Sequence, residues 1–315
     1  MTSPKYNCLT QEQVDHFLEK GYVVIHDAFS KEHAAWMLKD VWVRLGLDPN
    51  NRESWTKPRI HMPKQRSILV SEFAPKAWDA IKDLLGGDEN IADAGKYWND
   101  SLIVNFGRDQ FEPHLVSGDP KQLDNWHTDG NFFRHFLDSP EQALLVIPIF
   151  SDEIKPKGGA TYIAPDSIPH IAKLLDDHPE GLLPGKPFNY PELVNKCNEF
   201  VEVTGKVGDV VLMHPFMMHS ASPNQLRIPR FITNPPVSLK TPFRFDRPLD
   251  QLNLVEQKTL KSLGKSSPYH FKPTADRVIF PSEQHDMWIR MQNEEKQRLK
   301  DYGTLESFTA IGVKP

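Results

Sequence analysis

Proline is the residue that most restricts how this chain can fold. The sequence contains 27 prolines among 315 residues, roughly 9% where about 5% is usual. Proline lacks a backbone N–H and clashes with the preceding turn of a helix, so it is confined to helix starts, turns and strand edges. Frequent prolines therefore imply many irregular connections and argue against a helical bundle. Strands joined by long loops are the better expectation.

Composition and charge exclude several functional classes. Hydrophobic residues make up 39% and charged residues 25%, which is typical of a packed globule. The 42 acidic and 37 basic residues give a net charge of -5, so general binding to nucleic acid is not expected. No run approaches the ~18 apolar residues of a membrane span. The two cysteines, Cys8 and Cys197, fit a reducing compartment, and we expect a cytoplasmic protein.

The first ninety residues or so supply mostly helices. Thr10 and Gln13 have the spacing of a capping box, and the helix that they begin should end at Gly21. A buried strand is expected over 22–25. Apolar residues at helical spacing predict further helices over about 31–45 and 76–85.

Short apolar or alternating runs replace this helical pattern from residue 101 onward. Proline and glycine separate them, as expected for strands of a sandwich or barrel. The predicted strands are 102–104, 143–150, 160–164, 199–203, 210–213 and 230–233. Helical spacing returns over 167–175 and 249–263, and a polar segment from 281 to 299 is most simply a solvated helix.

The chain is expected to form one domain over 1–315, because no long linker or internal repeat divides it. We expect a mainly β fold with flanking helices. Its parts would be a helical N-terminal region over about 9–90, a β core over about 98–240 and a helical C-terminal extension over about 241–315.

The WHTDG segment at residues 126–130 is the most informative motif. On an extended segment, residues i and i+2 point to the same side, so His127 and Asp129 could bind one ion. An imidazole nitrogen and a carboxylate oxygen suit Fe(II), and a second histidine would complete the facial triad of non-haem iron oxygenases. By itself the pair is more often structural, since single histidines usually cap or pair.

Two histidines follow the turn at 208–209 and could complete this set. His219 opens a loop-like segment, and Arg230 follows eleven residues later at the start of an apolar strand. A 2-oxo acid that chelates iron needs an anchor for its far carboxylate, and arginine provides one through its bidentate fork. We favour His219 as the ligand and assign the rival, His214, a strand-end or supporting role.

The ordered set of motifs resembles the phytanoyl-CoA dioxygenase family of Fe(II)/2-oxoglutarate-dependent oxygenases, from about residue 9 to 238. The segments that carry the resemblance are the helix start at 9–10, GYVVI at 21–25, WHTDG at 126–130, GGAT at 158–161, PDS at 165–167, GDVV at 208–211, His219 and Arg230. The resemblance implies a double-stranded β-helix core, a jelly roll of cupin-like type. It also implies iron bound by His127, Asp129 and His219, with 2-oxoglutarate bound by Arg230.

One departure from the family concerns the cosubstrate anchor. Members often carry a hydroxyl two residues after the distal histidine, but this position is Ala221 here. Thr161, Ser220 or Ser222 could compensate. Asn105, on the strand before the motif, is a further candidate contact to the cosubstrate, with turn capping as its alternative role.

The resemblance implies hydroxylation of a small organic metabolite, with dioxygen as the second substrate and succinate and CO2 as products. Desaturation, cyclisation and epimerisation remain open. A carboxylate at Asp129 disfavours halogenation, for which related enzymes carry a small residue there. The alternatives are a non-catalytic scaffold or sensor that binds a metal or metabolite, and a cupin-type metal enzyme without a 2-oxo acid. A monomer or homodimer is expected.

Overall fold

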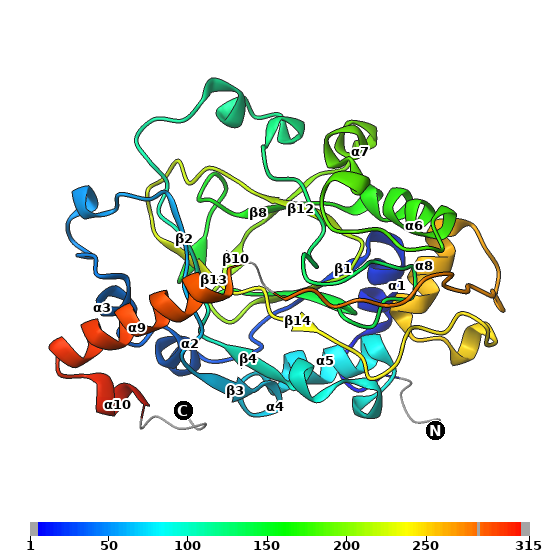
Figure 1. Ribbon diagram of the computed structural model, residues 1–315, viewed down its shortest axis with the longest axis horizontal. Helices are drawn as coiled ribbons and strands as arrows, with labels where there is room; N and C mark the ends of the chain where they lie inside the picture. Colours follow the sequence, from blue (N-terminus) through cyan, green and yellow to red (C-terminus); the bar gives the residue numbers. More distant parts are fainter. Residues whose placement is uncertain (1–5, 282–283, 310–315) are drawn as a thin grey trace.

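The computed structural model describes residues 6–281 and 284–309 of the chain. It is rich in short antiparallel sheets with helices around them, as expected from the sequence (Figure 1). Among these residues, no helix is both long and apolar enough to cross a membrane.

A four-stranded antiparallel sheet forms the centre of the fold. Its strands, in spatial order, are β1 (Tyr22–Ile25), β11 (Val210–Met213), β6 (Leu144–Pro148) and β14 (Pro236–Val237). Every residue of β6 and β11 is buried, which is the pattern of strands covered on both faces. The sheet thus joins a strand from the first thirty residues to strands more than a hundred residues later.

Two three-stranded sheets contain the candidate site residues His219, Thr161, Arg230 and Asn105. One has the order β12 (Met218–Ala221), β8 (Thr161–Ala164) and β9 (Val201–Val203). The other has the order β13 (Arg230–Ile232), β5 (Ile103–Asn105) and β2 (Arg59–His61). Two small pairs complete the strands: β10 (Gly205–Lys206) with β7 (Glu153–Ile154), and β3 (Ser67–Leu69) with β4 (Tyr97–Asn99).

The helices gather at the ends of the sheets (Figure 1). They are α1 (Gln11–Lys20), α2 (Lys31–Met37), α3 (Val41–Leu45), α4 (Val70–Phe73), α5 (Pro75–Leu85), α6 (Ile168–Asp177), α7 (Tyr190–Lys196), α8 (Leu254–Leu263), α9 (His285–Asp301) and α10 (Leu305–Thr309). Helix α1 has the predicted capping box and ends at Gly21 in the left-handed conformation. Helices α1 and α6 both pack against α8, so three segments far apart in the sequence meet at one side of the sheets.

The prediction of one helix over 31–45 is wrong. Two helices occupy this range, and Asp40 lies between them with a φ of 53°. A non-glycine residue in this left-handed region interrupts α-helical hydrogen bonding. The apolar spacing is nevertheless kept, because α2 and α3 bury Met37 and Val41 against the same core.

Candidate active site

Backbone pairing brings His127 and His219 together. The two residues form an isolated antiparallel bridge, in which each N–H donates to the other's carbonyl at 3.0 and 2.9 Å. Their imidazole rings lie 4.3 Å apart between centroids. His219 lies in strand β12, so the expectation that it opens a loop is wrong. The strand fixes its side chain more firmly than a loop would.

The side chains of His127, Asp129 and His219 converge on one point. Oδ1 of Asp129 lies 3.4 Å from Nε2 of His127 and 3.5 Å from Nε2 of His219. The three ligand atoms are all within 4.8 Å of one another. This arrangement is the two-histidine, one-carboxylate set that suits Fe(II), so the residues present fit such an ion.

Backbone carbonyls orient both imidazoles. Nδ1 of His127 lies 2.7 Å from the carbonyl of Asn125, and Nδ1 of His219 lies 3.2 Å from that of Met217. Each Nδ1 donates to its carbonyl when it is protonated, and Nε2 is the ring nitrogen that faces Asp129. Such outer hydrogen bonds fix the tautomer of metal-binding histidines.

The charges in this cluster support one another. Burial opposes ionisation of Asp129, but His219 and hydrogen bonds from both histidines outweigh it and hold the pKa of this carboxyl far below its usual value. Burial also opposes charge on His127, yet its contacts with Asp129 raise the pKa of its imidazole. A carboxylate that stays ionised is what a divalent ion requires.

Asn234 holds the remaining oxygen of the carboxylate. Its Nδ2 donates to Oδ2 of Asp129 at 3.2 Å, so Oδ1 is left to face the two histidines. No pattern in the sequence points to this residue. Asn234 follows strand β13 and precedes two prolines, and no spacing relates it to the WHTDG motif.

Arg230 is a buried cation that has no anionic partner among the residues that the structure describes. The residue is only 2% exposed to solvent. Its Nε donates to the carbonyl of Gly159 at 3.0 Å. Its Nη1 is buried and has no hydrogen-bond partner in the described structure. Burial, and to a lesser degree Arg59, lower the pKa of the guanidinium to about 9. A buried charge without a partner is costly, so this group fits an anion such as a carboxylate.

Gly159 makes room for this arrangement. Its φ is +77°, and a Cβ there would lie 2.5 Å from Nδ2 of Asn105. Glycine alone combines the left-handed backbone with this close approach. The left-handed backbone at Gly159 therefore also positions the carbonyl that holds Arg230.

Arg230 and the two converging histidines, His127 and His219, line one cavity of about 90 Å³. Its lining comprises Arg59, His61, Ile103, Asn125, His127, Leu145, Ile147, Thr161, His219, Ala221, Arg230, Ile232 and Asn234. Arg59 and His61 of β2 were missed at the sequence level. The sequence signal that could have found them is the alternation of polar and apolar residues over 59–61. In a strand, this alternation places the Arg59 and His61 side chains on one face.

Thr161 lies directly across from Ala221. The two residues are paired in the antiparallel ladder between β8 and β12, and both line the cavity. Ser222 instead donates its hydroxyl to the carbonyl of Ala160 at 2.7 Å, and Ser220 does not reach the cavity lining. A hydroxyl missing at position 221 is thus present on the neighbouring strand.

Asn105 is engaged by the backbone around it. Its Nδ2 donates to the carbonyls of Ser222 and Gly159 at 2.9 and 3.3 Å, and its Oδ1 accepts from the N–H of Gly107 at 3.1 Å. These bonds fit the turn-capping alternative. Asn105 sits between Arg230 and Arg59 in the sheet order.

His214 lies away from the cluster. It is fully buried, with Nε2 3.0 Å from the hydroxyl of Thr259 on α8 and Nδ1 accepting from the N–H of Phe216. Burial, together with Lys258, lowers its pKa to about 3. A neutral histidine that joins β11 to α8 agrees with the supporting role predicted for it.

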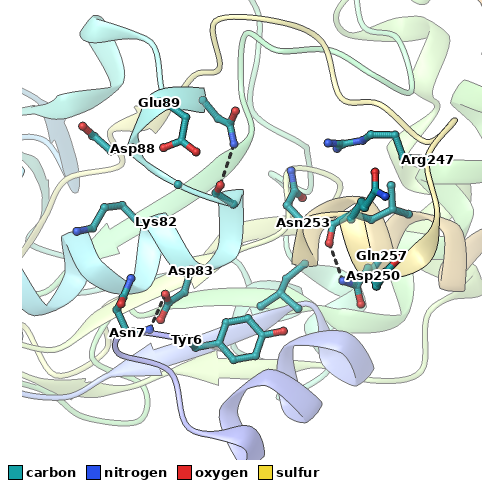
Figure 2. A pocket seen from close by; sticks show the side chains of 16 residues that line it. Tyr6, Asn7, Lys82, Asp83, Asp88, Glu89, Arg247, Asp250, Asn253 and Gln257 are labelled. Atoms are coloured by element: carbon teal, nitrogen blue, oxygen red, sulfur yellow. Dashed lines mark hydrogen bonds between the residues drawn. The ribbon is translucent and has the colours of Figure 1, made fainter. Parts of the chain in front are cut away.

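A larger cavity of about 510 Å³ has a different lining. Figure 2 shows it between α5 and the start of α8, with Asp83, Asp88 and Asp250 around it. Asp83 accepts from the backbone N–H groups of Asn7, Cys8 and Leu9, so this carboxylate fastens the N-terminal segment. No residue of the candidate active site lines this cavity.

Comparison with known proteins identifies the family. The model of the family described as phytanoyl-CoA dioxygenase matches residues 17–231. A probable alpha-ketoglutarate-dependent hypophosphite dioxygenase of Stutzerimonas stutzeri is 28% identical over 226 residues, which cover 70% of this chain and 75% of that protein. An ectoine dioxygenase of Sphingopyxis alaskensis is 25% identical over 256 residues, or 76% and 81% of the two chains.

Solved structures also resemble this chain. The apoform of EctD from S. alaskensis has a TM-score of 0.44 and 19% identity, over 88% of this chain and 90% of that one. The match of the family model to more than half of the sequence confirms the resemblance seen in its motifs, and the chain belongs to the phytanoyl-CoA dioxygenase family.

Proposed function

We propose that this chain is an Fe(II)- and 2-oxoglutarate-dependent dioxygenase that hydroxylates a small molecule and releases succinate and CO2. The observation that carries the proposal is the buried Arg230 guanidinium, which has no acidic partner among the described residues and lines the same cavity as His127 and His219, the histidines that converge with Asp129. A metal site alone would fit a cupin-type enzyme or a sensor. A buried anion anchor beside it favours a chelating cosubstrate with a second carboxylate.

Each residue then has a distinct task. His127, Asp129 and His219 would hold the iron, which supplies dioxygen activation when bound. Arg230 would pair with the far carboxylate of 2-oxoglutarate, and Thr161 would donate its hydroxyl to the same group. Asn234 would keep Asp129 oriented. We place Asn105 beside Arg230, where its side-chain amide donates to the carbonyl of Gly159 and so supports the turn at this residue.

The sheets are consistent with a double-stranded β-helix. Strands β6 and β11 lie in the central sheet, and isolated bridges at His127–His219 and Ile149–Ile232 link segments that are far apart in the sequence. We propose a single oxygenase domain with this jelly-roll core, active in the cytoplasm. Because the curated relatives are named for hypophosphite and for ectoine, we take the substrate from neither.

An anaerobic titration tests the metal and cosubstrate assignment. Adding Fe(II) and 2-oxoglutarate to the full chain should produce the charge-transfer absorption of a chelated 2-oxo acid, and His127→Ala should abolish it by removing a ligand. The matched control is His285→Ala, an exposed histidine on α9, which should keep the absorption. An intact protein without the band would refute the proposal.

Arg230→Met tests the anchor separately. We expect the affinity for 2-oxoglutarate to fall by roughly 10- to 100-fold. This is the loss in affinity that corresponds to the free energy of one hydrogen bond to a charged group. The free energy of unfolding without ligands should stay the same or rise, because an uncompensated buried charge is removed. Calorimetric titration and thermal unfolding measure the two effects. A strong loss of stability with unchanged binding would assign Arg230 a structural role.

A further inference from the structure

We propose that the substrate carries an oxyanion group, a carboxylate or a phosphonate, which Arg59 and Arg108 bind at the mouth of the active site. This inference rests on the proposed function, because it takes Arg230 as the anchor of the cosubstrate. It extends that function by assigning a chemical class to the substrate.

A second cavity adjoins the one that holds the candidate metal ligands. It measures about 280 Å³ and shares Arg59, Asn125 and Ala221 with the smaller cavity. The remainder of its lining is Pro58, Asn105, Arg108, Phe111, Leu115, Asp124, Ser222 and Pro223. Because the three shared residues border both volumes, a molecule in the larger cavity lies next to the cavity that His127 and His219 line.

Arg59 is separated from Arg230 by one strand. In the sheet, Asn105 of β5 pairs with Arg230 on one side and with Arg59 on the other. Neighbouring strands lie about 4.8 Å apart, so the two arginine backbones are separated by roughly 10 Å. They project from the same face of the sheet. One anion on Arg230 therefore leaves room for a second anion on Arg59.

Neither Arg59 nor Arg108 is bonded to an acidic side chain within the described part of the chain, although Asp124 lines the same cavity. No hydrogen bond or ion pair involves their side chains there, and Arg108 only lies over the ring of Phe111, 5.4 Å from its centroid. The nearby acid, Asp124, is paired with His114 at 3.0 Å. Burial lowers the pKa of Arg59, while Asp124 and Arg108 act on it in opposite directions.

The chemistry of the pair selects its ligand. Two guanidinium groups present planar, charge-assisted donors that match the oxygens of carboxylates and phosphonates. Phe111, Leu115 and Pro223 give the same cavity an apolar side. The geometry suits a small acid, with its head group at the two arginines and its reacting hydrogen toward the metal.

Binding of simple anions to the full chain tests this inference without turnover. We would load the protein with redox-inert Ni(II) and saturating 2-oxoglutarate, which occupies Arg230, and titrate methylphosphonate and acetate by calorimetry. Arg59→Gln and Arg108→Gln should each weaken binding of the preferred probe by about tenfold or more. Arg290→Gln, at an exposed position on α9, is the matched control and should bind like wild type.

The outcomes separate this inference from the proposed function. Preference for methylphosphonate or for acetate assigns the head group, whereas failure of the wild type to bind either overturns the inference. Unchanged binding in both glutamine variants overturns it as well. If Arg59→Gln weakens binding of 2-oxoglutarate instead, Arg59 belongs to the cosubstrate and the inference is wrong. If the wild type binds no 2-oxoglutarate, the proposed function fails, and the anion titration without it still decides the roles of Arg59 and Arg108.

Discussion

At the scale of single residues, the candidate site depends on partners that hold its charged groups in place. Carbonyls orient both imidazoles, Asn234 holds one oxygen of Asp129, and the Gly159 carbonyl holds Arg230. The motif residues themselves could be predicted, because the spacing of His127 and Asp129 and the chemistry of His219 and Arg230 are visible in the sequence. Asn234 could not, because only folding brings it to Asp129.

Asn234→Ala should weaken metal binding by about 10- to 100-fold, the usual cost of losing a partner of a metal ligand. The reason is that Oδ2 of Asp129 loses its donor and the carboxylate can rotate. Titration with Co(II), followed by absorption, measures the effect. Asn195→Ala, exposed on α7, provides the comparison, and equal affinities for the two variants would contradict the assigned role.

At the scale of elements, sheet pairing decides which side chains share the cavity. The sequence predicted seven of the fourteen strands in the described structure and the helices near 11–20, 76–85 and 168–175, because their apolar periodicity is local. It did not predict the order β13-β5-β2, which aligns Arg230, Asn105 and Arg59. Nor did it predict the break at Asp40, where a left-handed residue interrupts a continuous apolar pattern.

Strand β11 and helix α8 are joined by a histidine that should make stability depend on pH. Above about pH 6.5 the His214 ring is neutral in both the folded and the unfolded chain. Below this pH, His214 binds a proton in the unfolded chain, whereas in the folded chain its pKa is lowered to about 3 and it stays neutral. His214 should therefore lower the free energy of unfolding by up to ~1.4 kcal/mol per pH unit as the pH falls through this window.

His214→Asn can still accept a hydrogen bond from Phe216 and does not titrate in this range. The variant should show a smaller loss of stability than wild type between pH 6.5 and pH 4. Urea unfolding at a series of pH values gives the two slopes. Identical slopes would mean that His214 is protonated in the folded protein.

At the scale of the whole molecule, a buried charge network fastens the C-terminal helices to the N-terminal half. Arg44 of α3 contacts Asp100 at 3.1 Å and Glu295 of α9 at 2.9 Å. Arg66 contacts the same Asp100 at 2.9 Å, and the ring of Phe308 in α10 covers its guanidinium. The polar segment predicted as a solvated helix is therefore solvated on one face only.

Glu295→Ala should lower the free energy of unfolding by about 3 kcal/mol, because it removes one partner of a buried ion pair. Its neighbour Glu294 is exposed, and Glu294→Ala should change stability by less than about 0.5 kcal/mol. Chemical denaturation of both variants makes the comparison. Equal effects would show that α9 is not held through Glu295.

The sequence by itself indicated the sheet-rich class with flanking helices and the longer local elements, and it singled out His127, Asp129, His219 and Arg230 as candidates, since each depends on short-range pattern or on side-chain chemistry. Only the tertiary structure decided which residues surround them. Strand order, the bridge between His127 and His219, and the placement of Arg59, Thr161 and Asn234 arise from pairing between distant segments. Those pairings are set by packing of the whole core, for which no local pattern in the chain carries a signal.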